Sequence, residues 1–224
     1  MYKLFDALCC ICKKEEVLKH LEIDMDSRLE RIVKFCELID KEKFIQRRTY
    51  LSDGVRLEND SEHAWHMAVM ALLLSEYANE KVDKLKVVSL LLIHDLVEIY
   101  AGDTFAYDED GKKSQKTREN AAAEKLFSQL PDDLCAYFRG LWDEFEAELT
   151  PESRFAHCLD NFQPTMLQHA SKGRAWKEGG RKLSEVCKRN AGSAKGSEAL
   201  WEYAKERFIK PEIESGNLID DTNE

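Results

Sequence analysis

Residues 89–108, SLLLIHDLVEIYAGDTFAYD, carry ionisable side chains directly after an apolar run. Ionisable groups are seldom buried unless a partner or a metal ion compensates their charge. On a helix, His94 and Glu98 share one face because they are four residues apart, whereas Asp95 projects about 100° away from His94. A metal ion at the edge of this helix could therefore contact His94 and Asp95 together, with Glu98 one turn further along.

Two residues elsewhere in the chain could complete such a metal site. His63 lies 31 residues before His94, in the first turn of another apolar segment. Asp160 lies 65 residues after Asp95, in the segment RFAHCLDNF. Two imidazoles and two carboxylates suit Co, Mn, Ni, Fe or Zn better than calcium, which prefers oxygen ligands alone. Each residue also has a plain structural interpretation, because buried histidines are commonly hydrogen-bonded within the core and Asp160 could pair two helices.

Three segments, in this order, resemble the HD-domain metal-dependent phosphohydrolases. They are ENDSEHAWHMAVMALLLSEYAN, LLIHDLVEIYAGDTFAYD and RFAHCLDNFQP, and the resemblance extends over residues 27–172. Together they look most like the branch that contains the bacterial 5′-deoxynucleotidases. The resemblance implies an all-α helical bundle with one divalent transition metal at the edge of its core. The residues that match the metal ligands of the family are His63, His94, Asp95 and Asp160.

The resemblance also implies roles for residues around the metal. It places a catalytic carboxylate at Glu98, a second acid at Asp103 and a phosphate-binding arginine at Arg48. Arg47 is adjacent, and which of the two arginines binds the phosphate stays open. The family can have a further site acid where this chain has Glu144, but Glu144 lies in an acidic run and a surface role is equally compatible with the sequence.

The activity implied by the resemblance is removal of the 5′-phosphate from (deoxy)nucleoside monophosphates; another small phosphate ester stays open as the substrate. Two other functions compete with it. An HD-type oxygenase with two irons would need additional histidines between Asp95 and Asp160, and His157 alone lies there. A non-catalytic module that only binds metal or nucleotide would have no need of Glu98 and Asp103 beside its metal.

The elements that must position these residues are predicted to be helices within one domain. The predicted helices cover residues 27–44, 61–79, 84–100, 114–130, 132–148, 152–173 and 197–209. Pro164 should bend or divide the sixth helix. Residues 47–63 are predicted to form an extended loop, and the glycine-rich segment 173–196 a mobile excursion. We divide the chain into an extension (1–26), an HD domain (27–210) and a C-terminal tail (211–224).

The two most apolar helices, 61–79 and 84–100, are predicted to form the centre of the core. Trp65 is assigned to that core. Two such helices leave apolar surface to cover in a chain of this size, and the resemblance implies a homodimer.

Composition limits the classes of partner and the compartment. The 224 residues carry a net charge of −10, which argues against binding to nucleic-acid polymers. No segment is apolar enough to span a membrane, and the N-terminus has no signal-peptide pattern. The seven cysteines, including a cluster at Cys9, Cys10 and Cys12, are expected to be reduced thiols, which favours the cytoplasm.

Overall fold

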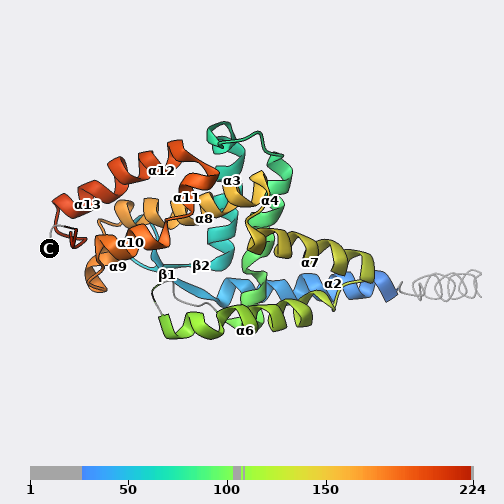
Figure 1. Cartoon of the computed structure of the whole chain (residues 1–224). Helices are drawn as coiled ribbons and strands as arrows, with labels where there is room; N and C mark the ends of the chain where they lie inside the picture. Colours follow the sequence, from blue (N-terminus) through green and yellow to red (C-terminus); the bar gives the residue numbers. More distant parts are fainter. Residues whose placement is uncertain (1–26, 103–106, 108, 223–224) are drawn as a thin grey trace, which may run out of the picture.

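The computed structural model describes residues 27–102, 107 and 109–222 (Figure 1). The predicted N-terminal extension, its cysteine cluster and Asp103 lie outside the described residues. The described elements are α2 (Ser27–Ile39), η1 (Asp40–Phe44), β1 (Gln46–Tyr50), β2 (Leu57–Asn59), α3 (Asp60–Leu74), η2 (Ser75–Tyr77), α4 (Lys84–Ile93), η3 (His94–Val97), α5 (Glu98–Ala101), α6 (Glu109–Phe127), α7 (Asp132–Ala147), α8 (Pro151–Ala170), α9 (Arg174–Glu178), α10 (Leu183–Arg189), α11 (Ser193–Gly196), α12 (Glu198–Ala204), η4 (Lys205–Ile209) and α13 (Lys210–Glu214). The predicted all-α class is confirmed, with one short hairpin added.

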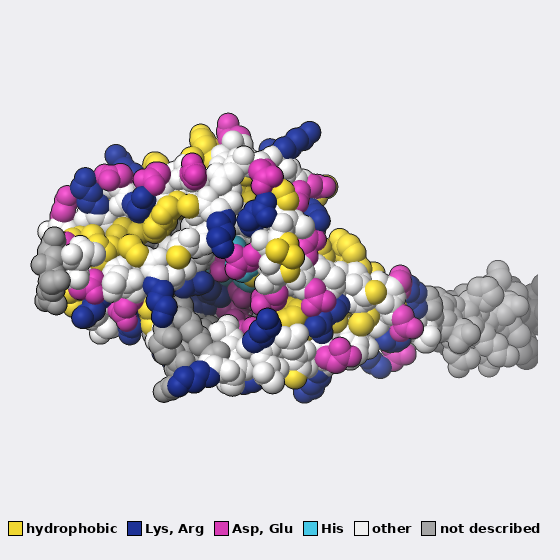
Figure 2. Space-filling model, in the orientation of Figure 1, with side chains coloured by type: hydrophobic (Ala, Val, Ile, Leu, Met, Phe, Trp, Pro, Cys, Tyr) yellow, Lys and Arg dark blue, Asp and Glu magenta, His cyan; other side chains and the backbone are white. Residues whose placement is uncertain are grey.

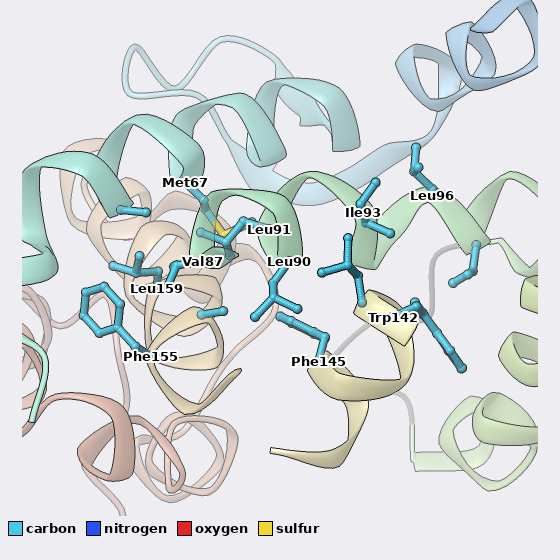
Figure 3. Packing of buried hydrophobic residues seen from close by; sticks show 14 of the residues in the cluster. Met67, Val87, Leu90, Leu91, Ile93, Leu96, Trp142, Phe145, Phe155 and Leu159 are labelled. Atoms are coloured by element: carbon cyan, nitrogen blue, oxygen red, sulfur yellow. The ribbon is translucent and has the colours of Figure 1, made fainter. Parts of the chain in front are cut away.

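Helices α3, α4 and α8 pack against one another at the centre of the molecule. Side chains from all three are completely buried and contact one another (Figure 3); they include Met67, Leu90, Leu91, Phe155 and Leu159. Full burial of one such side chain contributes about 1.5–3 kcal/mol, so helices that are surrounded on several sides need apolar residues on several faces. This explains the nearly continuous apolar sequence of α3 and α4.

The start of α3 is determined by a capping box. The Asn59 side chain accepts a hydrogen bond from the Glu62 amide at 2.9 Å, and the Glu62 carboxylate accepts one from the Asn59 amide at 3.1 Å. The sequence had suggested Asp60 or Ser61 as the cap, so the helix begins one residue earlier than expected. Capping holds the first turn in a defined geometry, and His63 belongs to that turn.

The predicted helix 84–100 is interrupted where its ionisable residues begin. Helix α4 ends at Ile93, the chain turns through the 3₁₀ segment η3, and the short helix α5 ends at Ala101, with Gly102 as its C-terminal cap. Gly102 has φ 73°, a conformation that glycine adopts without steric cost, as the predicted stop required. The tighter winding of η3 changes the angle between the successive side chains His94 and Asp95.

Residues predicted as an extended loop form an antiparallel hairpin before α3. Gln46 pairs with Asn59 and Tyr50 pairs with Leu57. The turn between the strands is closed by a hydrogen bond from the Val55 amide to the Asp53 carboxylate. Longer strands are identified by alternating apolar and polar residues, and these two strands are too short to show that pattern.

Helix α8 is one continuous helix despite Pro164. Thr150 caps it and Pro151 occupies its first position, as predicted. Pro164 has no amide hydrogen to donate to the Asp160 carbonyl and was predicted to bend or divide the helix; it does not divide it. The residues before and after the proline therefore face the site from one uninterrupted element.

The prediction of an excursion over residues 173–196 is wrong. The segment contains α9, α10 and α11, and α11 packs directly on α8. A side chain at Gly196 would place its Cβ 2.2 Å from the Arg154 carbonyl oxygen, so this contact requires glycine. The predicted tail 211–224 is also packed in part, because α13 extends to Glu214 and Leu218 is buried beside Trp176 and Val186.

Within the described ranges, none of the helices is long and apolar enough to cross a membrane.

Candidate metal centre

Three elements bring potential metal ligands to one point at the edge of the core. His63 comes from α3, His94 from η3 and Asp160 from α8, and all three residues are buried. One ligand atom from each lies within 4.8 Å of the others. His63 Nε2 is 3.1 Å from Asp160 Oδ1, and His94 Nε2 is 3.9 Å from the same oxygen. Residues far apart in the chain therefore converge at metal-site spacing.

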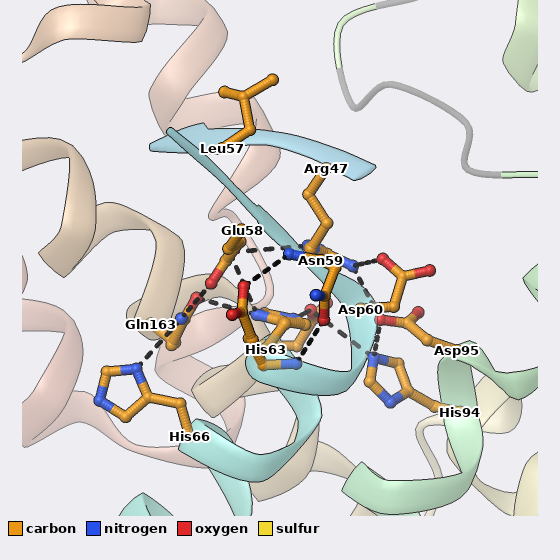
Figure 4. Close-up of polar contacts among 12 residues, drawn as sticks. Arg47, Leu57, Glu58, Asn59, Asp60, His63, His66, His94, Asp95 and Gln163 are labelled. Carbon is orange, nitrogen blue, oxygen red and sulfur yellow. Dashed lines mark hydrogen bonds and ion pairs between the residues drawn. The ribbon is translucent and has the colours of Figure 1, made fainter. Parts of the chain in front are cut away.

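Asp95 lies beside this group, as Figure 4 shows. Its Oδ2 is 3.1 Å from His94 Nε2 and accepts a hydrogen bond from Arg47 Nη1 at 2.8 Å. Burial alone would raise the pKa of Asp95, but the positive charges of His94 and Arg47 outweigh it and hold the pKa well below its usual range. Asp95 is therefore an ionised ligand candidate on the same side of the group.

Hydrogen bonds behind the two imidazoles decide which nitrogen carries the proton. His63 Nδ1 is 2.9 Å from Gln163 Oε1, and His94 Nδ1 is 2.9 Å from the Leu91 carbonyl oxygen. A carbonyl oxygen can only accept, so each Nδ1 must donate. The tautomer, inferred from these partners, leaves both Nε2 atoms facing the carboxylates.

The charges around the ligand atoms favour a cation at this point. Burial and the charge of Arg47 lower the pKa of His63 to about 4, so at neutral pH its Nε2 presents a lone pair to the Asp160 carboxylate oxygen. For His94, burial acts in the same direction, but Asp95 and Asp160 outweigh it and raise the pKa to about 9. The carboxylates thus attract positive charge to this point. Two imidazole nitrogens and two carboxylates fit a divalent transition metal.

The two neighbouring arginines have different environments. Arg47 is largely buried, and its Nη1 contacts Asp95 at 2.8 Å and Asp60 at 3.4 Å. Arg48 is exposed and lines the cavity beside the metal site, where it forms no hydrogen bond or ion pair with the described residues. Both arginines line the cavity, but Arg47 is held by buried carboxylates, whereas the side chain of Arg48 is exposed.

The predicted acids are placed differently. Glu98 begins α5, is 9% exposed and lines the cavity. Asp103 lies outside the described residues. Glu144 does not line the cavity: its carboxylate pairs with Lys86 at 2.8 Å and accepts a hydrogen bond from Thr150 at 2.5 Å. The structure thus gives no support to the substrate-binding role predicted for Glu144, whereas Glu146, two residues later, lines the cavity.

The cavity has a volume of about 310 Å³ and opens on the face in Figure 2, where acidic side chains lie in a hollow with several basic side chains in and around it. Sequence reasoning missed Glu119 and Glu146, and it missed Arg181 and Arg189 from the glycine-rich segment. Arg189 Nη2 is 3.3 Å from Asp160 Oδ2. No periodicity or motif singles out these residues, because the folding of α6, α7 and α10 around α8 brings them to the cavity.

His157 is not part of a second metal site. Its Nε2 donates a hydrogen bond to the Phe145 carbonyl oxygen at 2.8 Å, and its ring stacks on the Phe145 ring at 3.9 Å. The group of His63, His94 and Asp160 is the one set of three potential ligands found among the described residues. The geometry favours one metal ion over a pair.

Comparison with known proteins gives consistent results. The protein 5′-deoxynucleotidase HDDC2 of Xenopus laevis is 33% identical over 130 residues, which are 58% of this chain and 63% of that protein. The human 5′-deoxynucleotidase HDDC2 is 31% identical over 142 residues, 63% of this chain and 67% of the human protein. The chain thus matches just under two thirds of the first relative and 67% of the second.

A crystal structure from Magnetospirillum magnetotacticum, described as a predicted metal-dependent phosphohydrolase, superposes with a TM-score of 0.82. It is 43% identical and covers 87% of this chain and 97% of its own. Residues 39–201 match the model of the HD domain, a range that includes all four predicted metal ligands. The chain therefore belongs to the HD-domain family.

Proposed function

We propose that this protein is a metal-dependent phosphohydrolase that removes the 5′-phosphate from (deoxy)nucleoside monophosphates. The observation that carries the proposal is the convergence of His63, His94 and Asp160, with Asp95 beside them, at a cavity that His94, Asp95 and Asp160 line. A cavity of about 310 Å³ is the size of a small-molecule site. The relatives named 5′-deoxynucleotidase support the substrate class.

The proposed metal ligands are His63, His94, Asp95 and Asp160, and the proposed ion is one of Co, Mn, Ni, Fe or Zn. When bound, such an ion lowers the pKa of a water molecule and neutralises charge on phosphoryl oxygens. Arg47 holds the Asp95 carboxylate in place through its 2.8 Å contact. It acts as a positioning residue.

Glu98 and Arg48 are the proposed groups that act on substrate. Glu98, one turn beyond His94 in the cavity wall, accepts a proton from the attacking water or gives one to the leaving alcohol. The exposed guanidinium of Arg48 can form paired hydrogen bonds to the phosphate oxygens. Asp103 stays a proposed second acid on the strength of the resemblance alone.

A phosphate-release assay tests the proposed function. Metal-free protein is supplied with each of the five metals in turn and offered 5′-mononucleotides, 3′-mononucleotides and p-nitrophenyl phosphate. We expect metal-dependent release of phosphate from the 5′-mononucleotides in preference to the other esters. Binding of metal without turnover of any ester would contradict the activity and favour a non-catalytic module.

An exposed apolar stripe supports a proposed homodimer. Trp65, Val69, Leu72 and Leu73 follow helical spacing on α3, and all are exposed. Trp65 is 65% exposed, so its assignment to the core is wrong. Light scattering should give twice the mass of one chain, and Leu73→Glu should give the monomer with the fold retained in circular dichroism. A monomeric wild-type protein at micromolar concentration would refute the dimer.

We propose the cytosol as the location of the protein. The four cysteines in the described residues, Cys36, Cys135, Cys158 and Cys187, are free thiols, which suits a reducing compartment. Localisation of the tagged chain in cell fractions tests this.

A further inference from the structure

A completely buried amide lies behind the imidazole of His63. Gln163, on α8, has no exposed surface, and its Oε1 lies 2.9 Å from His63 Nδ1. Its Nε2 donates to Glu58 Oε2 at 2.9 Å and lies 3.2 Å from His66 Nδ1 (Figure 4). Glu58, at the middle of β2, is 1% exposed. The hairpin and two helices therefore meet in one polar cluster.

When Glu58 is ionised, the donors and acceptors in this cluster have one consistent order. Burial raises the pKa of Glu58 to about 7, and its Oε1 lies 3.6 Å from His63 Nδ1, which also favours a proton on that nitrogen. The Glu58 oxygen accepts, so the nitrogen of the Gln163 amide must face it. The amide oxygen then faces His63, and an oxygen can only accept, so His63 must carry its proton on Nδ1. The second hydrogen of the Gln163 amide points to His66 Nδ1, which accepts. All three contacts are satisfied together in this arrangement.

We infer that Glu58 and Gln163 are positioning residues that select the tautomer of His63 and direct its Nε2 lone pair to the metal site. The inference rests on the metal site of the proposed function. In the other tautomer, Nε2 would carry a proton and could not ligate a metal. Groups that orient a ligating histidine typically change metal affinity about 10- to 100-fold when mutated.

Burial is a second reason to assign a function to this cluster. A carboxylate and an amide that are removed from water cost free energy, and apolar residues of the same volume are often equally stable or more stable in such places. Gln163 has no exposed surface, so its amide depends on hydrogen-bond partners within the folded protein. Selection of a ligand tautomer gives the chain a reason to retain both groups.

Metal affinity measured by calorimetry tests the inference, with Mn²⁺ and Co²⁺ titrated into metal-free protein. Gln163→Leu removes the acceptor and should weaken binding about 10- to 100-fold. Glu58→Gln keeps the shape but lets the Gln163 amide face either way, so it should weaken binding as well. In the double variant Glu58→Gln/Gln163→Glu, the new carboxylate accepts from both His63 and the new amide, so affinity should return toward the wild-type value.

Gln168→Leu is the matched control, because Gln168 is a buried amide on the same helix that also lines the cavity, yet no hydrogen bond among the described residues joins its side chain to a proposed ligand. It should keep the wild-type metal affinity. Imidazole ¹⁵N spectra of the metal-free proteins provide an independent readout: His63 should be protonated at Nδ1 in the wild type and lose this preference in Glu58→Gln.

Two results would overturn the inference. One is wild-type metal affinity in both single variants; the other is an unchanged His63 tautomer in both. If the wild-type protein bound no metal in the same titration, the proposed function would fail instead, and the imidazole spectra would still decide whether Glu58 and Gln163 select the tautomer.

Discussion

The cavity has two sides that differ in burial and in the kind of residue they contribute. The helical side, from α3, η3 and α8, contributes buried histidines and aspartates, and His63 has no exposed surface. The other side, from the β1–β2 hairpin and α9–α10, contributes arginines. Arg48 is exposed, and the side chain of Arg189 is 34% exposed. A metal site needs ligands held in a fixed geometry, whereas a substrate must reach the groups that bind it. The two sides match these separate requirements.

The largest expected effect is on the helical side. His94→Ala should abolish stoichiometric metal binding and reduce phosphate release to the level of the metal-free protein, because it removes one of the four proposed ligands. Elemental analysis after reconstitution measures the first effect. His157→Ala is the control, since His157 bonds to a backbone carbonyl and should not change metal content. Full metal content in His94→Ala would remove the distinction between the two sides.

Glu98→Gln tests the acid beside the metal. General acid–base assistance is typically worth about 10²–10⁴ in rate, so kcat should fall by that factor while metal content stays constant. Steady-state kinetics and elemental analysis on the same sample separate the two quantities. Glu144→Gln should behave like the wild type because Glu144 pairs with Lys86 outside the cavity. Near-normal turnover in Glu98→Gln would show that the assigned acid is wrong.

Arg48→Ala tests the open side of the cavity. Loss of a hydrogen bond to a charged group costs about 1.5–3 kcal/mol, or roughly 10- to 100-fold in kcat/KM, and KM should rise without loss of metal. Arg56→Ala is a matched control, since Arg56 pairs with Glu62 at 2.5 Å and does not line the cavity. Arg47→Ala should differ from both by weakening metal binding, because Asp95 loses its partner. If Arg47→Ala raised KM alone, the roles of the two arginines would be exchanged.

Gly196→Ala has the smallest expected effect on activity and tests whether α9–α11 fold together with the helical side. The added Cβ would lie 2.2 Å from the Arg154 carbonyl oxygen, so α11 must shift from α8. Overpacking of this kind typically costs about 1–3 kcal/mol. The variant should unfold at lower denaturant concentration in one transition. Gly140→Ala, where a Cβ meets nothing within 4 Å, is the control.

The family, the helical class and the central helices could be predicted from sequence because they depend on short motifs and on the spacing of apolar residues along the chain. Apolar spacing identifies α3, α4 and α8, and the residues nominated as ligands, His63, His94 and Asp160, do converge. Trp65 was misassigned because an apolar residue on an apolar helix has the same pattern whether it faces the core or another surface. The 173–196 segment was misread because glycine marks both loose loops and close helix contacts, and Gly196 is of the second kind.

The sequence alone determined which residue types could ligate a metal and which segments of the chain would present them, since both follow from side-chain chemistry and the pattern of apolar residues. Only the tertiary structure decided which nitrogen of His63 carries the proton, which of the adjacent arginines is buried, and which acids and arginines complete the cavity. Glu58 and Gln163 are 105 residues apart, and Arg189 reaches Asp160 across 29 residues. Such contacts depend on how separate elements pack, and no local pattern in the chain encodes the distance or direction between them.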